Sequence, residues 1–232
     1  MLGLGDAAVL LLSTVALIYG LYMMIARKLP LYFQLSTASE GCLLLGYLFD
    51  VCDYLVNGYH GDGYLIGYLG SIGSFLFLLA ASVGYMDGIM DDGSAPIKKC
   101  RYIAWIGPLI AIMLWIPVIL SEESLKIKIV YTLVWIPATF SVYYNLKHAI
   151  IPDMGFGFVK AIRPFNIAAV CFTYLQLIHL TMWCYCDWLP LLISGIVFGS
   201  SCIAMIVMAD KGVKRWVLYS IFYLFPYFFL CF

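Results

Sequence analysis

Five side chains have the residue types and spacing expected of a binding pocket: Glu40, Asp50, Gln176, His179 and Trp183. Glu40 lies well inside a long apolar segment, and no Lys or Arg lies in the interior of any apolar segment to pair with it. An ionisable group in lipid is costly and therefore marks a candidate functional site. We expect a proton site there, or the counter-charge of a cationic ligand. The alternative is a neutral, hydrogen-bonded carboxyl that serves packing.

The other four side chains lie near the ends of two apolar segments. Gln176, His179 and Trp183 share one stripe of a helix at 100° per residue. Asp50, on the Glu40 segment, lies at about the same depth as His179. The two segments are therefore expected to face each other across an outward-opening pocket. The alternatives are a hydrated helix end for Asp50 and a hydrogen-bonded core position for His179.

The elements that must position these residues are membrane-spanning helices. The 232-residue chain is 64% hydrophobic and only 11% charged, whereas soluble chains are about a quarter charged. Disorder is excluded by the same composition, and a formal charge of zero shows no nucleic-acid footprint.

About 20 apolar residues cross a bilayer. Seven segments meet this length, and an eighth, of 17 residues, is marginal but has no polar face to offer to water. The predicted spans are 6–26, 31–56, 64–86, 102–120, 127–146, 164–186, 189–209 and 216–232.

Basic residues in the loops predict the orientation of these spans. Eleven lie in the loops after spans one, three, five and seven, and the other two are Lys126 and Lys128. The N-terminus is therefore expected outside. With no soluble domain in the sequence, residues 1–232 are predicted to be one all-α transmembrane bundle, a multi-pass protein of the cell (inner or plasma) membrane.

Glycines and cysteines suggest packing more than chemistry. Glycines recur through 63–73 at spacings that let helix backbones approach closely in lipid. Cys52, Cys184 and Cys186 all lie near the predicted outer face, where oxidation can occur. A disulfide between Cys52 and one of the other two is a hypothesis.

Carboxylates and basic residues also crowd the loop 87–101. A divalent cation, or a diphosphate–metal pair, is one hypothesis for these carboxylates. The alternative is a solvated turn of mixed charge, which we favour because a second Asp-rich motif is missing. The three histidines of the chain are expected at different depths in the membrane, so they are not expected to bind a haem or a zinc ion together. No metal, cofactor or catalytic residue is predicted.

Three short runs carry a resemblance to a known family: Gly67-Tyr-Leu-Gly70-Ser-Ile-Gly73, Gly84-Tyr-Met-Asp87 and Asp91-Asp92-Gly93. They resemble the seven-helix membrane sensor modules that precede diguanylate cyclase or histidine kinase domains in Gram-positive bacteria. The resemblance implies a bacterial sensor. This sequence has no output domain, so signalling would need a separate partner.

Three functions remain open. The preferred one is a receptor-like protein whose pocket between spans two and six binds a small molecule or lipid. The second is a small-solute transporter, proton-coupled through Glu40 and suited by two Trp-Ile-Pro phrases at 115–117 and 135–137 that hint at an inverted repeat. The third is an intramembrane lipid-modifying enzyme that uses Glu40, Asp50 and His179 as acid–base groups. A non-enzymatic role is favoured over the third.

Overall fold

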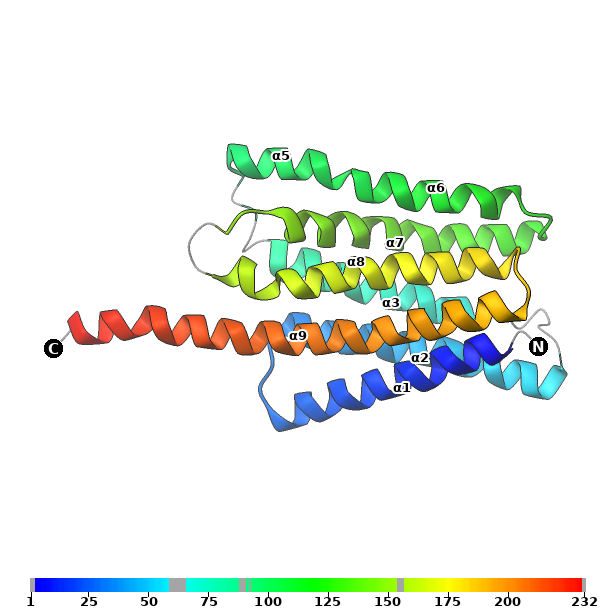
Figure 1. The fold of residues 1–232 in the computed structure, drawn as a ribbon, viewed down its shortest axis with the longest axis horizontal. Helices are drawn as coiled ribbons and strands as arrows, with labels where there is room; N and C mark the ends of the chain where they lie inside the picture. The colour runs from blue at the N-terminus through cyan, green and yellow to red at the C-terminus, as the bar shows by residue number, and fades with distance from the viewer. Residues whose placement is uncertain (1–2, 59–65, 88–90, 92, 154–156, 231–232) are drawn as a thin grey trace.

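The chain folds into a bundle of roughly parallel and antiparallel helices in a computed structural model (Figure 1). Residues 3–58, 66–87, 91, 93–153 and 157–230 are described, with Gly3, Tyr85 and 216–230 as backbone only. This part of the chain contains helices and no strand. The elements are α1 (Gly3–Ala26), α2 (Leu31–Asn57), α3 (Gly67–Ala81) with the π-helical turn η2 (Ser82–Asp87), α5 (Ala95–Ala104), α6 (Ile106–Leu120), α7 (Leu125–Ile150), α8 (Phe158–Trp183) and α9 (Trp188–Leu230).

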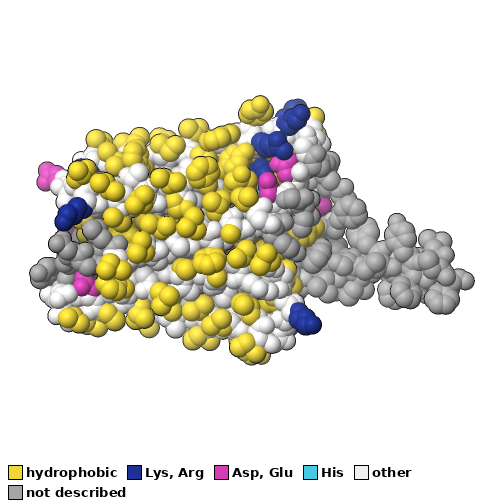
Figure 2. Space-filling view, turned by 180° about the vertical axis from the view of Figure 1, so that it is seen from behind, with side chains coloured by type: hydrophobic (Ala, Val, Ile, Leu, Met, Phe, Trp, Pro, Cys, Tyr) yellow, Lys and Arg dark blue, Asp and Glu magenta, His cyan; other side chains and the backbone are white. Residues whose placement is uncertain are grey.

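The helices are long and apolar enough for a multi-pass membrane protein. Six stretches of the described chain meet the length and hydropathy of a span: α1, α3 with η2, α5 with α6, α7, α8 and α9. Helix α2 is equally long but carries three carboxylates and is not among the six. Figure 2 shows hydrophobic side chains spread over most of the bundle surface. The predicted all-α membrane bundle is confirmed, while the number of spans and their orientation stay predictions.

The last two predicted spans are not separate helices. Segments 189–209 and 216–232 were expected on either side of a polar loop, but α9 is one helix of 43 residues. At 1.5 Å per residue it is about 65 Å long, twice a bilayer core. Figure 1 shows it continuing past the other helices instead of turning back. Within the polar stretch, Asp210 and Lys214 pair one turn apart, which favours the helix.

The helix ends also differ from the predicted boundaries. Helix α5 begins at Ala95 and meets α6 at a break around Trp105, whereas a single span was expected from residue 102. Helix α7 continues to Ile150, and α8 begins at Phe158 instead of residue 164. Several basic residues expected in loops therefore lie on the ends of helices.

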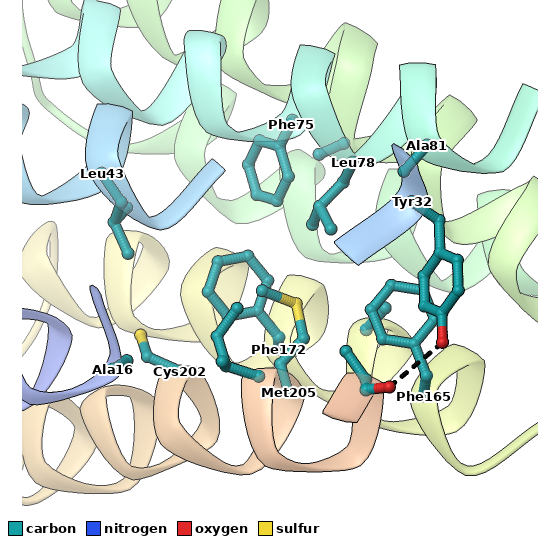
Figure 3. Close-up of a cluster of buried hydrophobic side chains, with 14 of the residues drawn as sticks. Ala16, Tyr32, Leu43, Phe75, Leu78, Ala81, Phe165, Phe172, Cys202 and Met205 are labelled. Atoms are coloured by element: carbon teal, nitrogen blue, oxygen red, sulfur yellow. Dashed lines mark hydrogen bonds between the residues drawn. The ribbon is translucent and has the colours of Figure 1, made fainter. Parts of the chain in front are cut away.

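Aromatic and aliphatic side chains from four helices fill the core. Figure 3 shows Phe75 and Leu78 of α3 facing Phe172 of α8 and Met205 of α9. The Tyr32 hydroxyl of α2 donates a hydrogen bond to the Ala209 carbonyl of α9, with an O···O distance of 3.1 Å. The centre of the bundle is therefore well packed.

Glycines set the spacing of α2 and α3. A Cβ added at Gly70 would lie 2.5 Å from the Cys42 carbonyl oxygen and 2.6 Å from the Gly46 Cα. These atoms belong to backbone, so they cannot move aside cheaply. The packing role expected of the glycines in 63–73 is confirmed at Gly70, and it brings the ends of α2 and α3 together where Asp50 lies.

Candidate functional site

A small polar cavity lies at the end of the bundle where α1 begins and α2 and α8 end. Its free volume of about 10 Å³ is enough for roughly one water molecule. Residues from four helices line it: Asp6, Tyr47, Asp50, Gly67, Tyr68, Ser71, His179, Leu180 and Trp183.

Three of the five predicted residues meet at this cavity. Asp50 comes from α2, and His179 and Trp183 come from α8. Helix α2 packs mainly on α3 and α1, whereas α8 packs mainly on α9 and α7. The two helices thus reach a common cavity with α1 and α3 completing its wall, so the site belongs to four helices and not to two.

His179 is held between a hydroxyl and a carboxylate. Its Nδ1 lies 2.7 Å from the Ser194 Oγ, and its Nε2 lies 3.7 Å from the Asp6 Oδ1. The Ser194 Oγ also lies 3.0 Å from the Leu191 carbonyl oxygen of its own helix, so the direction of its hydrogen bond with Nδ1 depends on the tautomer of the imidazole. His179 therefore links α8 to α9 through Ser194 and brings its ring close to the Asp6 carboxylate of α1.

The order Asp6, His179 and Ser194 is also that of a hydrolytic triad. In a triad the aspartate accepts a hydrogen bond from the histidine, but here the Asp6 Oδ1 lies 3.7 Å from the His179 Nε2, beyond hydrogen-bond distance. The Ser194 Oγ also lies close to the Leu191 carbonyl of its own helix. The three side chains therefore do not form the continuous hydrogen-bonded chain of a triad.

Asp50 brings a second carboxylate to the cavity without a compensating cation. It is 7% exposed, and its Oδ1 has no hydrogen-bond partner among the described residues. The Tyr47 hydroxyl, equally buried, also lacks one. A Cβ at Gly67 would lie 1.8 Å from the Asp50 Oδ1, so glycine makes room for the carboxylate. No Lys or Arg lines the cavity in the described chain. A positively charged group could therefore bind beside these carboxylates.

Gln176 lies one step from the cavity. Its side chain is fully buried, and its Nε2 donates a hydrogen bond of 2.8 Å to the Ser71 Oγ, which does line the cavity. Gln176 therefore ties α8 to α3 and positions Ser71. Gln176 itself does not line the cavity.

Glu40 lies apart from the cavity. Ten residues separate it from Asp50 on α2, about 15 Å along the helix. It is fully buried and interacts with the thiol of the buried Cys202 on α9, a weak hydrogen-bond donor. Apart from that thiol, neither carboxyl oxygen has a hydrogen-bond partner among the described residues. A functional carboxyl and a hydrogen-bonded packing residue both stay open as interpretations of Glu40.

The acidic loop after α3 forms a partly buried ion-pair network at the opposite end of the bundle. Lys147 of α7 contacts both Asp87 and Asp91, and its Nζ lies 3.1 Å from the Asp91 Oδ2. The His148 Nε2 lies 2.9 Å from the Asp87 Oδ1, and Arg101 holds Asp91 with contacts of 2.5 and 2.8 Å. Figure 2 shows basic and acidic side chains side by side at this end.

The network lowers the pKa of both carboxyls. Burial raises the pKa of Asp87, but hydrogen bonds from His148 and Lys147 outweigh it and leave the pKa below its ordinary value. The hydrogen bonds from Arg101 are the largest cause of the lowered pKa of Asp91. Within the described chain, no group of three or more His, Cys, Asp or Glu side chains is arranged to hold a metal ion. The carboxylates hold cations of the protein, and the turn is less solvated than expected.

The disulfide hypothesis is wrong for this structure. Cys52, Cys184 and Cys186 are all free, as are the other described cysteines. Cys52 is exposed on α2. The Cys184 thiol donates to the Leu180 carbonyl of its own helix, at 3.9 Å. Lying near the same end of the bundle was not enough to pair them.

Sequence reasoning missed Asp6, Tyr47 and Ser194 as parts of the site. Asp6 offered a signal, because it is an ionisable residue at the start of the first apolar segment. Tyr47 and Ser194 are of types common throughout membrane helices, and only the packing of α9 against α8 brings Ser194 to His179.

Comparison with protein families, curated proteins and solved structures found no match to this chain. The functional argument therefore depends on the site itself.

Proposed function

We propose that the protein is a receptor-like membrane protein that binds a small ligand in the cavity between α1, α2, α3 and α8. The observation that carries this proposal is the convergence of Asp6, Asp50 and His179 from three helices on one buried space without a Lys or Arg among the described lining residues. The Asp50 Oδ1 is buried without a hydrogen-bond partner among the described residues, which reduces stability, and a role in binding accounts for this cost.

The charge of the lining favours a cationic ligand, such as a small amine. Two carboxylates and the polar groups of Tyr47 and Ser71 offer oxygen acceptors. The present volume admits about one water molecule, so an organic ligand would bind with a separation of the helix ends around the cavity. That movement is the step by which binding would be communicated.

Orientation and partner complete the proposal. With seven spans and the N-terminus outside, as the loop charges predict, the cavity faces the exterior of the cell. Output would pass to a separate signalling protein, in line with the resemblance to bacterial sensor modules.

Cysteine labelling tests the outward-facing pocket. In a background in which Cys52, Cys184 and Cys186 are replaced by serine, because all three are free near this end, Ser71→Cys places a thiol in the cavity wall. Ser74→Cys places one a turn deeper, where the Ser74 hydroxyl lies 2.8 Å from that of Ser39. We expect a membrane-impermeant thiol reagent, added outside intact cells, to label Ser71→Cys and not Ser74→Cys. Tetramethylammonium should slow the labelling. Ser71→Cys that is unlabelled, or labelled only from the inside, would contradict the proposal.

Proton-coupled transport is the second candidate, favoured by the fully buried Glu40 in the middle of α2, which has no cationic partner among the described residues. In liposomes that contain a pH-sensitive dye, transport predicts a solute-dependent proton flux that Glu40→Gln abolishes. Liposomes that show no flux with small amines would count against transport and leave the receptor proposal standing.

A further inference from the structure

A groove opens at the turn between α1 and α2, at the end of the bundle opposite the cavity. It has a volume of about 440 Å³ and is lined by Met24, Arg27, Lys28, Leu29 and Gln34. The Gln34 Nε2 donates a hydrogen bond of 2.8 Å to the Leu29 carbonyl and so fixes the turn that shapes the groove. The space is far larger than the cavity described above and lies in a different part of the molecule.

The two cations of the groove are incompletely neutralised. Arg27 has a half-exposed side chain, and its nearest carboxylate oxygen, on Asp210, lies 3.9 Å away. Asp210 already binds Lys214 and accepts a hydrogen bond of 3.0 Å from the Tyr19 hydroxyl. Lys28 is exposed and has no carboxylate partner among the described residues. The groove therefore carries spare positive charge and free N–H donors.

The surroundings of the groove are apolar. Met24 and Leu29 form part of its wall. On the adjoining helix surfaces Ile25 is 88% exposed, Tyr22 65% and Leu31 47%, as side chains that contact lipid tails are. A ligand that fits this surface has an anionic head and an apolar body.

We propose that this groove binds the phosphate of an anionic membrane lipid. The guanidinium of Arg27 matches phosphate oxygens in a fork, and Lys28 adds a point charge beside it. Basic recesses between membrane helices are suited to anionic headgroups. The apolar walls favour a lipid over free phosphate, which has no chains to place against them. The proposal does not depend on the ligand of the cavity.

Native mass spectrometry of the purified full-length protein tests the proposal, with phosphatidylglycerol, phosphatidylcholine and inorganic phosphate as probes. The Arg27→Gln/Lys28→Gln variant removes both cations. The matched control is Lys98→Gln/Lys99→Gln, which removes two exposed charges of α5 at the same end of the bundle. A Lys28→Gln single variant, which breaks no ion pair, serves if the double variant fails to fold.

We expect the protein to retain phosphatidylglycerol and not phosphatidylcholine. The groove variant should lose about tenfold in affinity, the single variant less, and the control variant nothing measurable. Equal losses in the groove and control variants, or equal binding of the two lipids, would overturn the proposal. Displacement of phosphatidylglycerol by millimolar inorganic phosphate would assign the groove to free phosphate and would also overturn it.

Discussion

Two clusters, one toward each end of the bundle, contain the same types of ionisable residue in opposite electrostatic settings. Each cluster has two aspartates and one histidine: Asp6, Asp50 and His179 at the cavity, and Asp87, Asp91 and His148 in the ion-pair network. Lys147 and Arg101 complete the network. No Lys or Arg lines the cavity in the described chain.

This difference separates a structural cluster from a candidate site. A carboxylate held by cations of the protein stabilises the fold, and its removal leaves buried charge behind. A buried carboxylate without a cation costs stability. Proteins retain such costs mainly where function needs them. Residue type alone would therefore not have distinguished the two ends.

The largest effect is expected at Lys147, because it serves two carboxylates and its side chain is only 3% exposed. Lys147→Met should lower the free energy of unfolding by about 3 kcal/mol, as when one partner of a buried ion pair is removed. Thermal and detergent unfolding of the purified protein would measure it. Lys98→Met, an exposed control at the same end, should change stability little. Similar losses of unfolding free energy in the two variants would contradict a structural role for the network.

The cavity end depends on the close approach of α2 and α3. Gly70→Ala should lower stability by about 2 kcal/mol, because the new methyl group meets backbone atoms of Gly46 and Cys42. Gly84→Ala is the matched control, since a Cβ there meets nothing within 4 Å. The measurement is the melting temperature of each variant. Equal melting temperatures for Gly70→Ala and Gly84→Ala would mean that α2 and α3 can separate without cost, and would contradict this prediction.

A smaller effect is expected in acid. Folding lowers the pKa of Asp87 and Asp91. Their contribution is therefore complete above the ordinary aspartate pKa of about 3.9 and is lost as the pH falls below it. The melting temperature should decline below about pH 4, and by less in Lys147→Met, which has already lost much of the network. Identical acid profiles for the two proteins would contradict this assignment.

Composition and hydropathy were sufficient to predict the helical membrane bundle. The positions of Asp50, His179 and Trp183 along their helices were sufficient to predict that they lie at the same depth. What the sequence could not supply was the lateral arrangement of the helices. Asp6 lies at the cavity because α1 packs beside α2. Glu40 lies away from the cavity because ten residues of helix separate it from Asp50.

The ion-pair network was hidden for a related reason. Loop polarity predicted Lys147 to lie beyond a span, but α7 continues through it and buries it against the loop carboxylates. Local charge patterns likewise predicted a loop at 210–215, where α9 is helical and Asp210 pairs with Lys214 one turn apart.

The most direct test of the contrast between the two ends is a pair of isosteric substitutions, Asp50→Asn and Asp91→Asn, measured by equilibrium unfolding at pH 7. Asp91→Asn should lose about 1–2 kcal/mol, because it weakens charged hydrogen bonds to Arg101 and Lys147. Asp50→Asn should leave stability unchanged or raise it, since no cation depends on that carboxylate. Equal destabilisation by both substitutions would contradict the account.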